Sequence, residues 1–324
     1  MGEAFAGRVV GKKAMVWGIL AQSIPDIDFI GALWLNTPTN LLAHRGFTHS
    51  FLFAVLITPL LAMLAKRWDS SRKISFLRWA TFFAVTILLH DILDAFNNYG
   101  VGWFEPFSHS RVSFNILYVA DPFFVAAPGI ALVFLILLKS NVKKRRFWWM
   151  LGLGVSFLYL NYCIINKVII NHDVKQLLGS QHIKYTTYFT TPAPLQNWLW
   201  FVAAGSDSGY YVGYRSVFDR ADRMTLEYFS RNSILIYAVS NTKEIKQLIR
   251  FSQGFYTIEK EHDTLIFNDL RFGQIIGWQN PKEQFAFHYY LHPAIDNKLV
   301  VQRGRFAKWD WRVIRSFFTR IRGN

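Results

Sequence analysis

Long apolar runs alternate with short polar segments through the first half of the chain. The runs cover residues 14–35, 51–65, 79–96, 117–138 and 147–165. A helix needs about 20 mostly apolar residues to cross a bilayer, so the short run at 51–65 needs its neighbours to complete a span. The pattern predicts an α-helical membrane domain with about five apolar helices over residues 1–168.

The pattern changes after residue 165. Short alternating segments at 183–189, 264–272 and 285–292 are separated by Gly, Asn, Asp and Pro, and no later apolar run is long enough to span. Alternation of this kind is typical of strands with one buried face. We therefore predict a soluble, mostly antiparallel β domain over residues 169–305.

The last segment, residues 306–324, has the pattern of a basic amphipathic helix. Trp309, Val313, Phe317 and Ile321 follow one another at four-residue steps, and basic residues occupy another face. Such a helix either lies in the interface of an anionic bilayer or packs on its own β domain.

Composition and charge agree with a membrane protein. Hydrophobic residues make up 52% of the 324 residues, and the net charge of +15 is spread over both halves of the chain. The excess of basic residues suits an anionic lipid surface, and no motif for reading nucleic acid is present. We expect the bilayer as partner and no nucleic acid. The single cysteine, Cys163, excludes an internal disulfide and a cysteine-rich zinc site.

Two basic clusters, residues 66–78 and 139–146, predict the orientation. Basic loops stay in the cytoplasm, whereas long domains translocate largely regardless of their charge. The N-terminal stretch lacks the pattern of a removable signal peptide. We expect a multi-pass protein of the bacterial cytoplasmic membrane. The acids and histidines would then sit at the outer helix ends, with the β domain outside the cytoplasm.

Acidic residues in these apolar runs need an explanation. An aspartate at the middle of a membrane helix costs about 2.5–3.5 kcal/mol, against roughly 0.3–0.6 kcal/mol gained per large apolar residue. Five such residues together cost on the order of 10–15 kcal/mol, and they are Asp26, Asp28, Asp91, Asp94 and Asp121. A shared cation, or a wet cleft at the helix ends, would reduce this cost.

Histidines accompany these acids at spacings that suit a metal ion. His90 and Asp94 lie four residues apart and share one helix face, while Gly46 allows a bend that brings His44 and His49 together. Imidazole and carboxylate are ligands of zinc and manganese. We predict a divalent metal site with an open number of ions.

Each candidate has an ordinary structural alternative. Pro25 and Asp26 are common in plain turns, and Asp121 before Pro122 suits a helix cap. Asp91, next to His90, either orients a ligand or acts as a general base. Arg111 and Asn98 are candidates for binding the anionic group of a substrate.

Other polar residues are given no part in the site. Glu105 and His109 are expected to be polar residues of the protein surface without a role in the site. The remaining histidines are predicted to be structural, and they are His172, His182, His262, His288 and His292.

Four motifs in order carry a family resemblance: PDID, HRGFTHS, LLHDILDAFNNYG and VADP. With TTPAPLQNWLWFV, GYYVGYRSVFD and NDLRFG further on, the chain resembles the bacterial membrane-bound metal-dependent hydrolases, the LexA-regulated inner-membrane type. The resemblance implies a metal centre on Asp26, Asp28, His44, His49, His90, Asp94 and Asp121. Family members begin further upstream with Thr-His or Thr-Gln, so a ligand is expected to be missing here, and Glu3 has no assigned role. A more distant likeness is to zinc-dependent phospholipase C.

Two classes of function follow. In the first, the protein is a metal-dependent hydrolase that acts at the extracytoplasmic membrane edge on a phosphoester or another amphipathic ester, such as a phospholipid. In the second, it is a non-catalytic membrane protein that binds a metal or handles an ion. The sequence leaves the substrate and the oligomeric state open.

Overall fold

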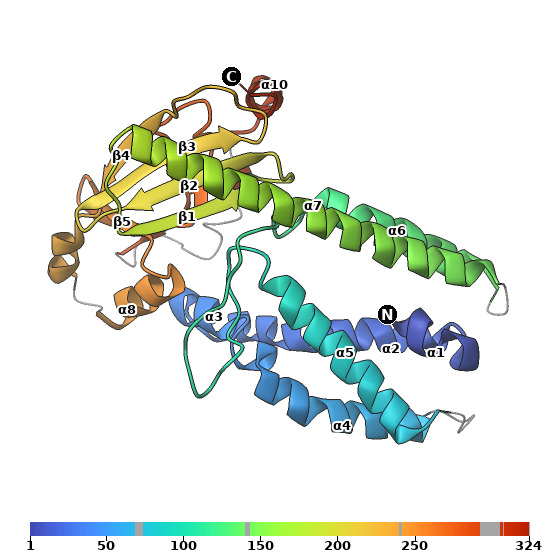
Figure 1. Cartoon of the computed structure of the whole chain (residues 1–324). Helices are drawn as coiled ribbons and strands as arrows, with labels where there is room; N and C mark the ends of the chain where they lie inside the picture. Colours follow the sequence, from blue (N-terminus) through green and yellow to red (C-terminus); the bar gives the residue numbers. More distant parts are fainter. Residues whose placement is uncertain (69–73, 140–142, 240–241, 292–304, 307, 324) are drawn as a thin grey trace. The chain divides into compact units, whose positions relative to one another are not determined.

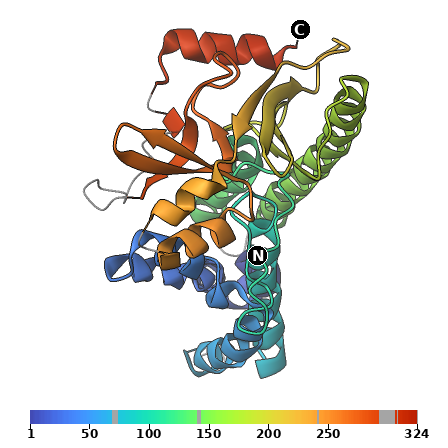
Figure 2. The same cartoon turned by 90° about the vertical axis from the view of Figure 1, so that its left-hand side faces the viewer.

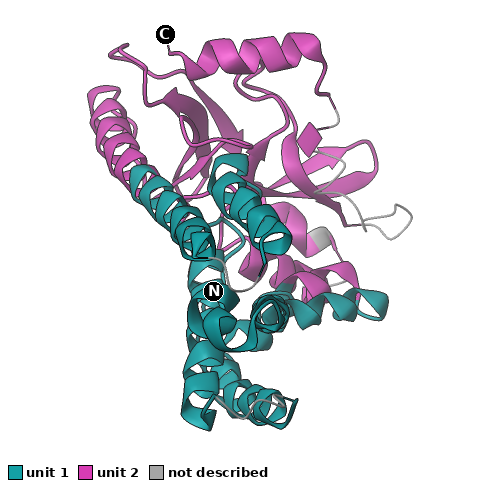
Figure 3. Cartoon of the chain, turned by 90° about the vertical axis from the view of Figure 1, so that its right-hand side faces the viewer, with its two compact units in different colours: residues 1–35, 42–114, 119–162 teal, residues 36–41, 115–118, 163–324 magenta. Residues whose placement is uncertain are grey.

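The computed structural model describes residues 1–68, 74–139, 143–239, 242–291, 305–306 and 308–323 (Figure 1). Two compact units form the chain (Figure 3). The first, unit 1, contains residues 1–35, 42–114 and 119–162, and the second, unit 2, contains residues 36–41, 115–118 and 163–324. The domain boundaries predicted at residues 168 and 305 stay predictions.

Unit 1 is built from helices. Its elements are α1 (Gly2–Val10), α2 (Lys13–Ser23), the 3₁₀ helices η1 (Pro25–Leu33) and η2 (Phe47–His49), α4 (Phe51–Trp68), α5 (Phe76–Asp94), α6 (Pro122–Leu137) and the first part of α7 (Lys144–Ser180). Helix α3 (Thr37–Ala43) bridges the two units in sequence.

All five predicted apolar runs contain helix, but the helices differ in whether they are long and apolar enough to cross a membrane. Among the described residues, α4, α5 and α7 are long and apolar enough to cross a membrane. Helices α2 and η1 together form a fourth candidate, bent by 57° at their junction. Pro25 starts η1 there, as expected for a residue that interrupts regular helix. Helix α6 has 16 residues and is shorter, so the predicted number of five is approximate.

The core of unit 1 lies along α5. Trp79, Phe82, Phe83 and Ile87 are fully buried against small residues of the neighbouring helices, which are Ala14 and Ala21 of α2 and Ala54, Ala62 and Ala65 of α4. Alanines let the helix backbones approach closely, as is common in membrane bundles. Large apolar residues on the outer face of α4, including Val55, Leu56 and Leu60, stay exposed. This face suits lipid.

Two helices differ from their predicted bounds. Helix α6 begins at Pro122 rather than at 117, because the Asp121 side chain caps it. Helix α7 continues to Ser180, past the predicted end at 165. The last part of α7 belongs to unit 2. It carries Ile170, Val174 and Leu177 on one side of the helix, and these residues are buried against the sheet of the same unit.

Unit 2 confirms the predicted antiparallel β structure. One sheet has the order β1 (Thr187–Pro192), β2 (Leu199–Gly205), β3 (Gly209–Ser216) and β4 (Leu226–Ser230); the other has the order β5 (Tyr256–Glu261), β6 (Thr264–Gln274) and β7 (Phe285–Tyr290). All neighbouring strands are antiparallel. Helix α8 (Thr242–Phe251) and the 3₁₀ helix η3 (Ser233–Ala238) connect the two sheets.

Strand β2 is buried on both faces because successive side chains alternate. Trp200 and Val202 pack against α7, whereas Phe201 points to the opposite face and packs with Leu270 of β6 and Phe285 of β7.

Helix α10 (Trp311–Ile321) lies along the sheets (Figure 2). It joins their core through Phe317 and Ile321, and Val313 on the same face is buried as well. The structure thus supports the second alternative for the C-terminal segment, packing on the β domain.

Candidate metal centre

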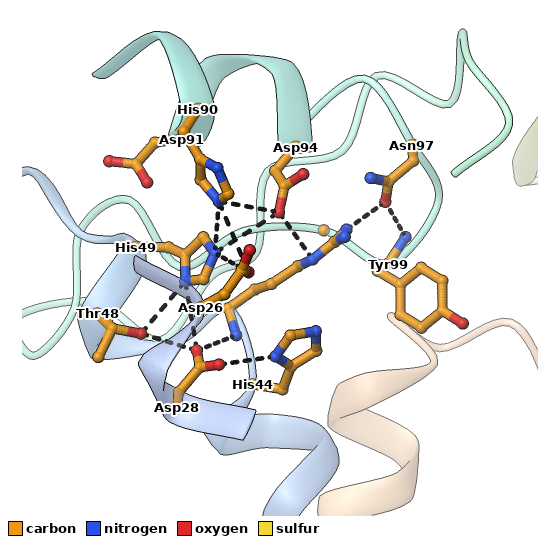
Figure 4. A network of polar contacts seen from close by, with 12 residues as sticks. Asp26, Asp28, His44, Thr48, His49, His90, Asp91, Asp94, Asn97 and Tyr99 are labelled. Carbon is orange, nitrogen blue, oxygen red and sulfur yellow. Dashed lines mark hydrogen bonds and ion pairs between the residues drawn. The ribbon is translucent and has the colours of Figure 1, made fainter. Parts of the chain in front are cut away.

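Four side chains of unit 1 converge on one point: Asp26, His49, His90 and Asp94 (Figure 4). Each offers a ligand atom, and these atoms all lie within 4.8 Å of one another. The Nε2 atoms of His49 and His90 are 3.2 Å apart. Asp26 Oδ1 lies 3.4 Å from His49 Nε2, and Asp94 Oδ2 lies 3.5 Å from it.

The fold brings these residues together from three elements. His90 and Asp94 occupy successive turns of α5, and their nearest ligand atoms are 3.8 Å apart. Asp26 stands in the first turn of η1, directly after the bend at Pro25. His49 ends η2 and is fully buried. The centre therefore depends on two short 3₁₀ helices that present side chains to one regular helix.

A carboxylate behind His49 fixes its imidazole ring. Asp28 Oδ2 lies 3.3 Å from His49 Nδ1 and accepts a 2.7 Å hydrogen bond from the Thr48 hydroxyl. When His49 binds a metal, a proton on Nδ1 directed to Asp28 would leave the Nε2 lone pair facing the other three ligand atoms. This is the usual relation between a metal-bound histidine and its supporting carboxylate.

Asp28 and His44 were predicted as metal ligands, but the structure does not bring them to the four converging atoms. His44 Nδ1 lies 2.8 Å from Asp28 Oδ1. Asp28 Oδ2 also accepts a 2.8 Å hydrogen bond from the Arg45 backbone. Both Asp28 oxygens are therefore engaged by atoms other than the four converging ligand atoms.

The electrostatics of the group favour a cation. Burial disfavours a charge on the His49 imidazole, but hydrogen bonds to Asp26, Asp28 and Asp94 outweigh burial and raise the His49 pKa to about 10. Carboxylates thus stabilise positive charge at this point. The donor set of two imidazoles and two carboxylates, all within reach of one centre, fits a divalent metal ion.

Arg45 was missed by the sequence reasoning. It is buried, and its Nε lies 2.9 Å from Asp94 Oδ2 while its Nη1 donates a 2.7 Å hydrogen bond to Asn97 Oδ1. The guanidinium also lies 5.1 Å from the Tyr99 ring centre. Its position inside the HRGFTHS motif, next to His44, was the only signal in the sequence.

The other predicted site residues have defined positions. Asp91 is fully buried, and within the described part of the chain neither of its carboxylate oxygens has a hydrogen-bond partner. Asn98 is buried. Arg111 donates hydrogen bonds to the carbonyls of Leu42, His44 and Gly100, which holds the loop that carries His44.

Asp121 lies outside the group of four. Its Oδ1 accepts hydrogen bonds from the Phe123 and Phe124 backbones, and its Oδ2 accepts one of 2.9 Å from the Tyr159 hydroxyl. The helix cap thus accounts for Oδ1, and the Tyr159 hydroxyl engages Oδ2. The geometry gives no support to Asp121 as a metal ligand.

The remaining histidines also lie apart from the centre. His109 is exposed and pairs with Glu105 at 2.7 Å, and neither residue belongs to the converging group. The converging group includes none of His172, His182, His262 and His288. His292 lies outside the described residues.

Apolar helices that carry such a His/Asp group define an integral membrane protein with a candidate metal centre. The chain belongs to the YdjM inner membrane protein family, whose model matches residues 1–170. This match confirms the resemblance seen in the motifs.

Two relatives extend the comparison. The chain is similar to the inner membrane protein YbcI of Escherichia coli K12, with 30% identity over 113 residues, which are 34% of this chain and 64% of that protein. It is also similar to the uncharacterized protein YfhP of Bacillus subtilis 168, with 24% identity over 275 residues, which are 80% of this chain and 77% of that protein. No solved structure matches the chain.

Proposed function

We propose that this membrane protein is a metal-dependent hydrolase that acts at the extracytoplasmic membrane edge on a phosphoester or another amphipathic ester. The observation that carries the proposal is the convergence of Asp26, His49, His90 and Asp94 within 4.8 Å. Ionisable groups in a membrane domain are costly and mark functional sites.

These four residues would hold the metal, and Asp28 would orient His49 from behind. A bound divalent ion would supply a water of lowered pKa and polarise a phosphoryl or acyl oxygen. Zinc and manganese both suit the donor set.

Arg45 adds a fixed positive charge at the edge of the group. Its guanidinium lies against Asp94, and such a fork of donors suits the oxygens of a phosphoester. We assign Arg45 the binding of the anionic group of the substrate. This charge favours a phosphoester over a neutral ester.

Asp91 follows His90 on α5 and keeps its predicted roles of general base or positioning residue. A base must come within hydrogen-bond reach of the water that it deprotonates, so this role requires a small movement of the buried carboxylate. Asn98 and Arg111 keep their predicted part in substrate binding, and Arg111 also holds the loop of His44.

The basic ends of the helices support an extracytoplasmic centre. Lys66 and Arg67 stand in the last turn of α4, and Arg78 stands in the first turn of α5. The centre lies at the other end of both helices. Because basic loops stay in the cytoplasm, the centre would face outward.

Metal analysis of detergent-purified protein beside a His90→Ala variant tests the proposal. We expect stoichiometric metal and hydrolysis of a phosphodiester probe in the wild type, and the loss of both in His90→Ala. His109→Ala is the matched control, because His109 is an exposed histidine outside the group, and it should keep both. Metal retained in His90→Ala would contradict the site. Metal without turnover across an ester panel would support the alternative, a non-catalytic metal-binding protein.

A further inference from the structure

A large apolar cavity lies inside unit 1, beside the metal centre. Its volume is about 680 Å³, within the roughly 300–1,000 Å³ typical of ligand sites. Helices α1, α2, α5, α6 and α7 form its walls. Representative lining residues are Ile19, Leu89, Leu93, Leu132, Trp149 and Leu153.

The cavity and the metal centre share the last two turns of α5. Leu89 and Leu93 line the cavity, and each directly precedes a residue of the centre, His90 and Asp94. Adjacent residues on a helix are separated by about 100°, so the two pairs occupy neighbouring faces. On the N-terminal side, Ser23 lines the cavity just before the bend that leads to Asp26.

The surroundings determine what can fill the cavity. The helices around it belong to an inner membrane protein, and the lining residues Ile19 and Leu132 are 59% and 41% exposed at its mouth. A cavity with mostly apolar walls offers water few hydrogen-bond partners. Within the membrane, the molecules that reach such a mouth are lipids.

We propose that this cavity, which we call the acyl groove, holds an acyl chain of a membrane phospholipid whose phosphoryl group reaches the His/Asp centre. The inference rests on the proposed function, because it takes the metal centre as the place where the phosphoester is hydrolysed. It identifies the substrate class as long-chain phospholipids.

The acyl groove would act by orientation rather than by affinity. Lipid hydrocarbon is as apolar as the groove, so an acyl chain gains little hydrophobic free energy by entering it. A chain held beside α5 instead places the attached headgroup near His90, and correct placement lowers the barrier to reaction. The groove should thus change turnover of long-chain substrates more than it changes their binding.

Photo-crosslinking tests occupancy without requiring hydrolysis. The probe is phosphatidylcholine with a diazirine midway along one acyl chain, added to the full-length protein in lipid nanodiscs. We expect labelled peptides from α5 and α6 at the acyl groove, in addition to general lipid labelling at the outer face of α4. The Leu132→Trp variant fills the groove and should lose the groove labelling only.

Ile130→Trp is the matched control. Ile130 also lies on α6 and is 54% exposed, but it does not line the groove. This variant should keep the wild-type labelling. Equal groove labelling in both variants, or labelling confined to the outer face of α4, would overturn the inference.

Kinetics separate this inference from the proposed function. With metal content unchanged, Leu132→Trp should lower kcat for a long-chain phospholipid several-fold and leave turnover of a short-chain soluble phosphodiester unaltered. Groove labelling without hydrolysis of either substrate would support the acyl groove and reject the hydrolase. Hydrolysis with no effect of Leu132→Trp on chain-length preference would reject the acyl groove alone.

Discussion

Asp26 and Asp28 are two residues apart, yet they face different partners. Asp26 points to His49 and His90 in the converging group, whereas Asp28 contacts His44, Thr48 and the rear of His49 (Figure 4). A 3₁₀ helix has three residues per turn, so positions two apart project in different directions. One carboxylate can therefore bind a metal while the other positions a ligand.

This difference predicts unequal effects on metal binding. Asp28→Asn should weaken the metal affinity by roughly 10–100-fold, as is usual for a partner of a ligating histidine. Asp94→Asn should remove binding, because it alters a ligand. Titration with a competing chelator measures both. Equal loss in the two variants would place Asp28 among the ligands.

Arg45 offers a second prediction at this scale. Arg45→Met should keep the metal and lower kcat/KM for a phosphodiester by roughly 10²–10³-fold, the usual cost of losing one donor to a developing anion. Arg45→Lys should recover part of the activity because it keeps the charge. Full activity in Arg45→Met would exclude the assigned role.

Sequence reasoning included the four converging residues among its candidates, together with Asp28, His44 and Asp121, but it did not distinguish their positions. His90 and Asp94 follow from helical periodicity alone. The separate roles of Asp26 and Asp28 depend on the turn geometry of η1, which the residues Pro-Asp-Ile-Asp do not specify. Arg45 was overlooked because an arginine beside a membrane helix resembles any other basic residue.

At the scale of elements, a buried ion pair connects the two ends of unit 1's sequence. Glu3 of α1 and Arg145 of α7 form two hydrogen bonds of 2.8 and 2.6 Å, and both side chains are almost completely buried. Arg145 also donates to the carbonyls of Leu135 and Leu138 near the end of α6. Glu3, which had no assigned role in the sequence, thus anchors α1.

Breaking this pair should destabilise the helical unit. Glu3→Gln leaves the Arg145 charge buried without its counterion, and such changes cost about 3–5 kcal/mol. Unfolding in a detergent mixture, followed by tryptophan fluorescence, measures the free energy. Glu105→Gln, in a pair with the exposed His109, is the control and should cost far less. Equal losses of unfolding free energy in the two variants would show that the buried Glu3–Arg145 pair stabilises the unit no more than the exposed pair does.

Element ends were harder to predict than the elements themselves. Asn166, Lys167 and Asn171 lower the hydropathy after residue 165, where the last predicted apolar run ends. The helix continues because Ile170, Val174 and Leu177 form a stripe whose partner is the sheet. Such an apolar stripe predicts a longer helix only when the position of the sheet that covers it is known.

At the scale of the whole molecule, the chain combines an apolar helical unit with an antiparallel β unit. The class of each unit could be predicted from the sequence, because long apolar runs and short alternating segments require different environments. The sidedness of the membrane protein is a further prediction, based on its basic clusters.

A reporter fusion tests that sidedness. Alkaline phosphatase fused after residue 324 should be active, because the β unit is expected outside the cytoplasm, and a fluorescent protein that folds only in the cytoplasm should stay dark at the same position. The opposite pair of results would place the β unit in the cytoplasm.

The central claim is that two histidines and two aspartates from three elements hold one cation. X-ray absorption spectroscopy of the zinc-loaded, detergent-purified protein tests it most directly. We expect nitrogen and oxygen neighbours at about 2.0–2.2 Å, including two imidazoles, and the same spectrum in the control variant His109→Ala. A wild-type spectrum with fewer than two imidazole neighbours would contradict the claim.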